Sequence, residues 1–244
     1  MTPEEEALAR RVKEGLALEI LYELQTGGGL AFDGVPNDAV EAQVAAIHAA
    51  VDNLRARFAA APDRLARLLG KDGLRVLDVG AGTAAWSLPF TRFDGVRVTA
   101  LDLPAELARL EHAVAAAGAL ERVTIVAGDA FTADPADLGT YDVVIVANVC
   151  HLFDSTRNRA LLRRLRALVD EQGVLAIVDQ LLELEPDWNR WCALYAVGVL
   201  HSSPGAFLFP LASYESWLHG SGFARVDATP LCPVPPLTLV TARR

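Results

Sequence analysis

Long hydrophobic runs are missing from this sequence, although hydrophobic residues occupy 52% of its 244 positions. No uninterrupted apolar stretch approaches the roughly 20 residues that a membrane-spanning helix needs. The first residues, Met1–Glu6, are acidic, whereas a secretory signal begins with a basic segment followed by an apolar one. We therefore expect a soluble, cytoplasmic protein without a membrane partner.

Cysteine is scarce, because the chain contains only Cys150, Cys192 and Cys232. An odd number of cysteines without paired metal-ligand spacing argues against a disulfide framework and against a metal site. The sequence therefore predicts free thiols in a reducing compartment and no bound metal.

Positively charged residues are fewer than negatively charged ones: the chain has 22 Lys and Arg, 31 Asp and Glu, and a net charge of -9. Nucleic-acid affinity comes largely from Lys and Arg that neutralise phosphates, so this balance disfavours a nucleic-acid partner. In one basic cluster the arginines alternate with leucines, and we interpret it as the solvated face of an amphipathic helix. Its members are Arg157, Arg159, Arg163, Arg164 and Arg166.

Two patterns divide the chain. Residues 1–70 carry apolar residues at helical spacing and predict a small N-terminal helical segment or lid. Its first helix ends at Gly27–Gly29, and its second runs from about Asp38 to Leu69 with a break near Ala61–Asp63. In residues 71–244 short apolar runs alternate with helical segments, which predicts a ligand-binding α/β domain with helices on both faces of a mostly parallel sheet.

The α/β domain is predicted to contain seven strands, of which the last two form an antiparallel hairpin around a Pro-rich turn. The predicted strands are Arg75–Val79, Val96–Asp102, Val123–Ala127, Asp142–Asn148, Val174–Gln180, Phe223–Ala228 and Leu237–Thr241. The predicted helices are Ala84–Thr91, Ala105–Ala117, Thr156–Val169 and Ser213–Gly220. An insertion after Gln180 is rich in large side chains, and its Trp191, Tyr195 and His201 are candidate substrate contacts.

A glycine turn, Gly80-Ala81-Gly82, follows the first strand, and Asp102 ends the next one. Glycine lets the backbone approach a ligand closely, and a carboxylate at the neighbouring strand end is placed to accept ribose hydroxyls. These two features predict a nucleoside-like ligand at the carboxyl edge of the sheet. The turn and Asp102 do not identify the cofactor, because a dinucleotide-binding site has the same pattern.

Three further motifs favour a cationic cofactor over a dinucleotide. Asp78 precedes the turn, where a carboxylate holds a cationic amino-acid group but repels a pyrophosphate. Gly128-Asp129-Ala130-Phe131 follows the third strand and offers an acceptor for an adenine amino group with an aromatic ring beside it. Asn148-Val149-Cys150-His151 follows the fourth strand and places polar groups over the reaction centre.

In this order and spacing the motifs resemble the Rossmann-like S-adenosylmethionine-dependent methyltransferases, and among them the small-molecule O-methyltransferases of plant and bacterial secondary metabolism. The resemblance runs from about Leu74 to the C-terminus. The segments that carry it are Val76–Gly82, Leu101–Pro104, Ala127–Phe131, Asn148–Phe153 and Gly173–Asp179. It implies a doubly wound, seven-stranded sheet whose last strand is antiparallel.

The resemblance also implies roles for individual residues. The methionine part of S-adenosylmethionine would be bordered by Gly80 and Gly82, and His151 would be the general base. The ribose and adenine would be contacted by Asp102, Leu103, Asp129, Ala130 and Phe131. Two features depart from the family: Ala84 replaces a third glycine, and most of the N-terminal dimerisation domain is absent. A homodimer through the N-terminal helices is therefore one arrangement among several.

The sequence thus predicts S-adenosylmethionine-dependent methyl transfer to a small aromatic or polyketide-like natural product, with oxygen as the favoured acceptor. A histidine suits the proton-accepting role because it titrates near neutral pH. Two alternatives stay open. One is a cofactor-binding protein of this fold that does not methylate, such as a cyclase, an isomerase or an accessory subunit. The other is an NAD(P)-dependent oxidoreductase.

Overall fold

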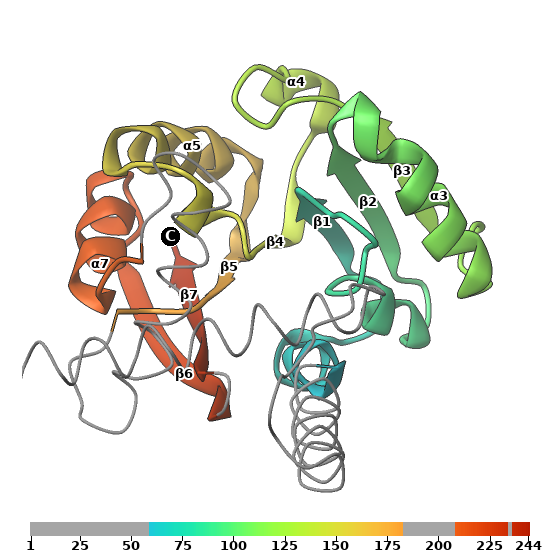
Figure 1. The fold of residues 1–244 in the computed structure, drawn as a ribbon, viewed down its shortest axis with the longest axis horizontal. Coiled ribbons are helices and arrows are strands. Elements are labelled where there is room, and N and C mark those ends of the chain that lie inside the picture. Colours follow the sequence, from blue (N-terminus) through green and yellow to red (C-terminus); the bar gives the residue numbers. More distant parts are fainter. Residues whose placement is uncertain (1–58, 183–207, 234–235) are drawn as a thin grey trace, which may run out of the picture.

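The computed structural model describes residues 59–182, 208–233 and 236–244. The first predicted helix, most of the second, and the candidate substrate contacts Trp191, Tyr195 and His201 lie outside these residues. Within them, the chain forms one seven-stranded sheet in the order β3-β2-β1-β4-β5-β7-β6 (Figure 1).

Five strands of the sheet are parallel and precede a C-terminal hairpin. The parallel strands are β1 (Arg75–Val79), β2 (Arg97–Asp102), β3 (Val123–Ala127), β4 (Tyr141–Ala147) and β5 (Val169–Asp179). The hairpin consists of β6 (Arg225–Pro233) and β7 (Pro236–Arg243), and β7 lies antiparallel between β5 and β6. The predicted sheet, including its antiparallel last strand, is confirmed.

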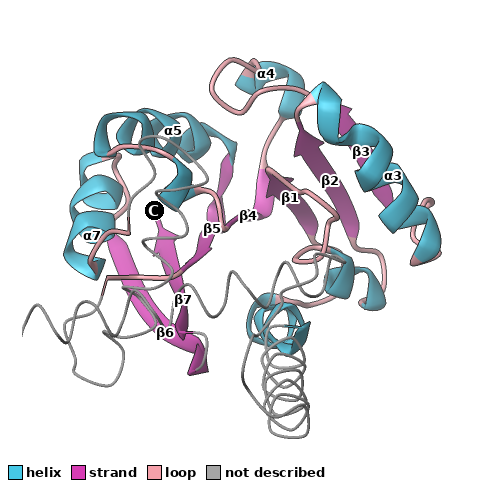
Figure 2. Cartoon of the chain, in the orientation of Figure 1, coloured by secondary structure: helices cyan, strands magenta, loops and turns pink. Residues whose placement is uncertain are grey.

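Helices cover both faces of the sheet (Figure 2). Helices α5 (Ser155–Leu168) and α7 (Leu211–Gly220) pack on one face through Leu161, Tyr214 and Trp217. Helix α3 (Leu107–Ala116) packs on the other face through Leu110 and Val114, and the short helix α4 (Pro135–Leu138) lies before β4. The burial of apolar stripes on both faces explains why the strands themselves are almost continuously hydrophobic.

The predicted helix break near Ala61–Asp63 is wrong, because residues 59–69 are continuously helical. Ala61, Leu65 and Ala66 lie at helical spacing and are at most 2% exposed, in the same hydrophobic core as the strands. Packing of this apolar face outweighs the helix-weakening effect of Pro62. The domain boundary at residue 70 stays a prediction.

Candidate functional site

The glycine turn after β1 is built from left-handed backbone. Gly80 and Gly82 have φ of 68° and 60°, a conformation that costs glycine little. A Cβ on Gly80 would lie 3.0 Å from Val149 Cγ2, so the turn has little room for a side chain. The Gly80 amide donates to Leu101 O at 2.9 Å, which holds the turn against the end of β2.

Asp102 joins the turn to the end of β2. Its Oδ2 accepts a hydrogen bond from the Gly82 amide at 2.6 Å, and its Oδ1 accepts one from the Leu103 amide at 2.7 Å. The Asp102 carbonyl also accepts from the Gly128 amide at 2.8 Å, which brings the end of β3 to the same edge. Since a carboxylate offers about four lone-pair sites, two amide bonds leave acceptor capacity for the hydroxyls of a ribose.

Asp78 lies beneath the turn and is 2% exposed. Burial raises the pKa of its carboxyl to about 6; the Ser87 hydroxyl, which donates to Oδ2 at 2.6 Å, opposes this shift, and the charge of Asp102 adds to it. A cation bound nearby would favour the ionised carboxylate. Asp78 and Asp102 thus make the turn a site that attracts positive charge.

The predicted helix Ala84–Thr91 is wrong. Turn residues follow Gly82, and a single 3-10 helix, η1 (Leu88–Arg92), comes after them. Ala84 has a left-handed φ of 55°, which interrupts helical geometry, and Pro89 lies at the start of η1. A dinucleotide site places its pyrophosphate at the N-terminus of an α-helix that directly follows the turn, and this turn has no such helix.

The loop after β3 carries the candidate adenine contacts. Asp129 Oδ1 accepts from the Phe131 amide at 2.8 Å and so forms a turn, while the Phe131 ring packs edge-on against Phe153 at 4.9 Å between centroids. The Arg157 guanidinium lies over both rings, 4.5 Å from the centroid of Phe131 and 4.7 Å from that of Phe153. Leu103, at the same sheet edge, is 49% exposed.

Helix α5 holds this loop in place through a second arginine. Arg164 Nε donates to Ala130 O at 3.3 Å, and its Nη2 donates to Ala133 O. The interpretation of the arginine cluster as a solvated face is therefore wrong for Arg164, which is half-buried, whereas Arg157, Arg159 and Arg163 are exposed as expected. Arg166 binds Gly222 O at 3.2 Å. The periodicity of the sequence predicted the polar face of the helix, but it could not predict which backbone carbonyls Arg164 and Arg166 bind.

Asn148 and His151 follow β4. Asn148 has a left-handed φ of 57°, and its backbone N–H donates a hydrogen bond to Val178 O at 2.8 Å. Asparagine tolerates this conformation better than most residues, and the turn directs the chain into the short helix η3 (Cys150–Leu152), which carries His151. The side chain of His151 is 4% exposed.

A buried carboxylate, Asp179 at the end of β5, holds His151. Asp179 Oδ1 lies 2.6 Å from His151 Nδ1 and accepts from the Gln180 amide at 2.9 Å. Its Oδ2 accepts from the His151 amide at 3.1 Å and from the Tyr214 hydroxyl at 3.2 Å. Four donors thus satisfy this carboxylate, which is 1% exposed.

The contact with Asp179 selects the tautomer of the neutral imidazole. When Nδ1 donates to the carboxylate, the lone pair of the neutral ring is on Nε2, which is then the nitrogen that accepts a proton. Neither Asp179 nor Tyr214 was among the site residues predicted from the sequence. The available signal was that Asp179 ends its strand with a carboxylate, as Asp102 does.

Cys150 lies beside His151 without a chemical role of its own. Burial raises the pKa of its thiol well above the ordinary value, and the charge of Asp179 raises it further. The thiol therefore stays protonated and packs as a small apolar side chain. In the part of the chain that the structure describes, no group of three or more His, Cys, Asp or Glu side chains is arranged to hold a metal ion.

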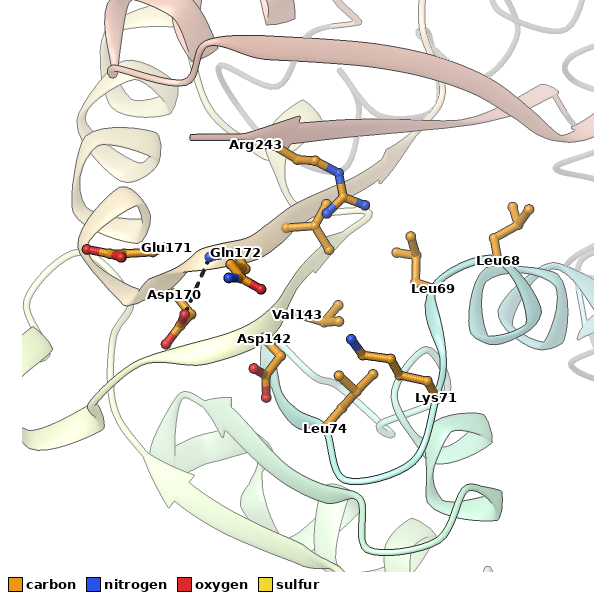
Figure 3. Close-up of a pocket in the computed structure, with 11 residues that line it drawn as sticks. Leu68, Leu69, Lys71, Leu74, Asp142, Val143, Asp170, Glu171, Gln172 and Arg243 are labelled. Carbon is orange, nitrogen blue, oxygen red and sulfur yellow. Dashed lines mark hydrogen bonds between the residues drawn. The ribbon is translucent and has the colours of Figure 1, made fainter.

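A separate cavity of about 410 Å³ lies at the opposite edge of the sheet (Figure 3). Asp142 and Asp170, near the amino ends of β4 and β5, line it together with Lys71 and Arg243. Arg75 pairs with both carboxylates, with Nη2 3.3 Å from Asp170 and Nε 3.5 Å from Asp142. In open α/β sheets ligands bind outside the carboxyl ends of the strands, so this cavity is not at the expected cofactor edge.

Comparison with known proteins agrees with this geometry. The family model described as "Methyltransferase domain" matches residues 53–228. This chain belongs to that family. None of the helices in the described ranges has the length and apolar character needed to cross a membrane.

Two curated relatives come from Streptomyces. A 3-hydroxy-5-methyl-1-naphthoate 3-O-methyltransferase of Streptomyces sahachiroi is 29% identical over 153 residues, which are 62% of this chain and 44% of the relative. An L-tyrosine C(3)-methyltransferase of Streptomyces lavendulae is 28% identical over 151 residues, which are 61% of this chain and 41% of the relative. This chain therefore spans less than half the length of either.

A solved structure shows the same fold. It is a putative O-methyltransferase from Nostoc punctiforme, which matches 98% of this chain and 70% of its own with a TM-score of 0.69 at 21% identity. At that identity the likeness concerns the fold, and it agrees with the seven-stranded sheet described above.

Proposed function

We propose that this protein transfers a methyl group from S-adenosylmethionine to an oxygen of a small aromatic or polyketide-like natural product. The observation that carries the proposal is the pairing of His151 with the buried Asp179 at the same sheet edge as the glycine turn and Asp102. The glycine turn and Asp102 fit an adenosyl sulfonium, and His151 can take a proton.

The residues of the turn fit the cofactor. Gly80 and Gly82 hold the turn in left-handed backbone, and Asp78 and Asp102 supply negative charge for a ligand that carries a sulfonium and an ammonium group. Asp102 would bind the ribose, while Leu103, Asp129, Ala130 and Phe131 would surround the adenine. Asn148 would lie beside the amino-acid part.

The chain's own residues act mainly by positioning and by proton transfer. S-adenosylmethionine, when bound, supplies an electrophilic methyl group on its sulfonium. His151 Nε2 takes the proton of the acceptor hydroxyl during attack, and Asp179 stabilises the imidazolium through Nδ1. The burial of both side chains keeps water from competing for that proton.

The printed names of the relatives support a small natural-product acceptor. One relative acts on a hydroxynaphthoate oxygen and another is a tetracenomycin polyketide 8-O-methyltransferase, whereas a third methylates carbon. Oxygen is therefore the favoured acceptor. The oxidoreductase alternative is disfavoured by the two carboxylates at the turn and by the absence of an α-helix directly after it.

The test combines cofactor binding with turnover. We expect the purified protein to bind S-adenosylhomocysteine in calorimetry and to methylate members of a panel of hydroxynaphthoates and hydroxynaphthalenes. His151→Ala should lower kcat by about 10² or more without changing the Kd for S-adenosylhomocysteine. Asp179→Asn should lower kcat as well, because an amide does not hold the Nδ1–H tautomer.

His112→Ala is a matched control, since His112 is exposed on α3. Turnover by His151→Ala equal to that of the control would rule out the role of general base. Binding of NAD(H) in place of S-adenosylhomocysteine would overturn the methyltransferase assignment. Binding of S-adenosylhomocysteine without methylation of any acceptor would support the non-methylating alternative.

A further inference from the structure

The carboxamide oxygen of Gln180 is buried and unpaired within the part of the chain that the structure describes. Gln180 is 4% exposed, and its Oε1 has no hydrogen-bond partner within residues 59–182, 208–233 and 236–244. Buried side-chain acceptors are nearly always satisfied, because an unmade hydrogen bond costs the full desolvation of the group. An unpaired carboxamide oxygen at a sheet edge therefore indicates a ligand that completes it.

Gln180 lies next to the proton-accepting pair. It directly follows Asp179, and its backbone amide donates at 2.9 Å to Asp179 Oδ1, the oxygen that also binds His151 Nδ1 at 2.6 Å. Two residues later the Leu182 amide donates to Phe209 O at 2.9 Å. The backbone is thus fixed on both sides of Gln180, and the carboxamide remains at the carboxyl edge of β5.

Asn158 shows what a structural amide looks like at this site. Its Oδ1 is also unpaired, but its Nδ2 donates to Cys150 O at 2.9 Å and to Phe153 O at 3.0 Å, which holds the segment that carries His151. The burial of Asn158 is explained by these two bonds. In the described part of the chain the Gln180 side chain makes no comparable bond, so a structural role does not explain its burial.

We propose that Gln180 determines acceptor specificity by accepting a hydrogen bond from a second donor group of the substrate. This inference rests on the proposed function and narrows its substrate class. The acceptor molecule carries a hydroxyl or N–H group in addition to the hydroxyl that is methylated, and Gln180 Oε1 binds that group. A site with a buried acceptor discriminates strongly against an analogue that lacks the donor, because the acceptor is then left unpaired.

The first experiment needs no substrate. Gln180→Met replaces the carboxamide with an unbranched apolar side chain of similar length and removes the unpaired acceptor. We expect the midpoint of thermal unfolding of the ligand-free protein to rise by about 2–8 °C. Asn158→Met is the matched comparison and should lower the midpoint, because two carbonyls lose their donor. A lower midpoint for Gln180→Met would show a structural role and overturn the inference.

The second experiment measures acceptor preference with dihydroxynaphthalenes and the corresponding monohydroxynaphthalenes. We expect the wild-type protein to show a kcat/KM at least about tenfold higher for the better dihydroxy compound than for its monohydroxy partner. Gln180→Met should remove that preference, and Gln180→Glu, which keeps an acceptor oxygen, should retain it. An equal loss for both acceptors in Gln180→Met, or a wild-type preference for the monohydroxy compound, would overturn the inference.

Calorimetry separates this inference from the proposed function. Gln180→Met should bind S-adenosylhomocysteine with the wild-type Kd, because Gln180 lies beside the proton-accepting pair and not at the glycine turn. A wild-type protein that does not bind S-adenosylhomocysteine contradicts the proposed function, whereas the thermal comparison of Gln180→Met and Asn158→Met still decides whether the carboxamide is held for a ligand.

Discussion

At the scale of single residues, Asp78 links stability to pH. Its pKa is raised from 3.8 to about 6 because burial disfavours the charged form. The unfolded chain loses this proton near pH 4, but the folded protein keeps it until about pH 6. Folding therefore takes up a proton between these values, and the contribution of Asp78 to stability, present below pH 4, is lost as the pH rises to about 6.

Asp78→Asn should remove this dependence. The amide oxygen still accepts from Ser87, whereas the buried charge is gone, so the free energy of unfolding at pH 8 should rise by up to about 3 kcal/mol. At pH 4 the two proteins should have nearly equal stability. Denaturant titrations at both pH values check this. A difference of the same size at pH 4 and pH 8 would show that titration of Asp78 is not the cause.

Ala84, in the turn that follows β1, carries backbone strain. Its left-handed φ of 55° costs a residue with a Cβ about 1–2 kcal/mol. Ala84→Gly relieves that strain, but it also removes a buried methyl group and adds freedom to the unfolded chain. We expect these effects to cancel to within about 1 kcal/mol.

Ala81→Gly is the matched control for Ala84→Gly. Ala81 lies in the same turn and is also buried, at 6% exposure, but it is not left-handed. Ala81→Gly also loses a buried methyl group and adds freedom to the unfolded chain, but it relieves no backbone strain. Its free energy of unfolding should therefore fall by about 1–2 kcal/mol more than that of Ala84→Gly. Equal losses in chemical denaturation would show that Ala84 is not strained.

At the scale of elements, helix α5 connects the two halves of the site. Arg157 in its first turn lies over Phe131 and Phe153, and Arg164, two turns later, binds the carbonyls of the adenine-side loop. The same helix holds the His151 segment through Asn158. One rigid element thus fixes the positions of the candidate adenine contacts and of the candidate base.

Removing Arg164 should loosen the adenine-side loop without touching the cofactor directly. We expect Arg164→Ala to raise the Kd for S-adenosylhomocysteine about tenfold, because the bonds to Ala130 and Ala133 then have to be replaced by water. Arg163→Ala removes an exposed neighbouring arginine and is the control for charge. If calorimetry gave the same Kd for both variants, the contact between α5 and the loop would not contribute to cofactor binding.

The sequence predicts some elements to the residue and misses others for physical reasons. The bounds of β1 and β3 agree with the prediction because both are short apolar runs. Strand β5 begins at Val169, five residues earlier than predicted. Its pairing with β4 shifts register near Tyr141, and Gly173 packs against the Tyr141 carbonyl oxygen there. The helix after the turn was mispredicted because the left-handed Ala84 depends on tertiary contacts.

The candidate site shows the same division. Gly80, Gly82, Asp102 and His151 could be selected from sequence because they follow apolar runs that end at one sheet edge. Asp179 carried the same signal, a carboxylate at a strand end, but its contact with His151, 28 positions away, is visible only in the fold. Gln180 could not be selected, since no pattern of residue types reveals its unpaired oxygen.

At the scale of the whole molecule, the last strand of the chain is an inner strand of the sheet. Strand β7 pairs with both β5 and β6, whereas β3 forms an edge and pairs only with β2. We expect the amides of residues 237–242 to exchange with deuterium only through global unfolding, and those of 123–127 to exchange faster through local opening. Mass spectrometry of the two peptides checks this order. Equal exchange rates would mean that β7 is not held on both sides.

The position of β7 also decides when the site becomes complete during synthesis. On the ribosome β5 has β4 on one side and an open edge on the other until residues 236–243 are made, which at about 5–20 residues per second takes several seconds. Asp179 pairs with Thr238, so the carboxylate that holds His151 lies on this late edge. The glycine turn and its neighbouring strand are thus synthesised well before the strand that carries Asp179 is paired on both sides.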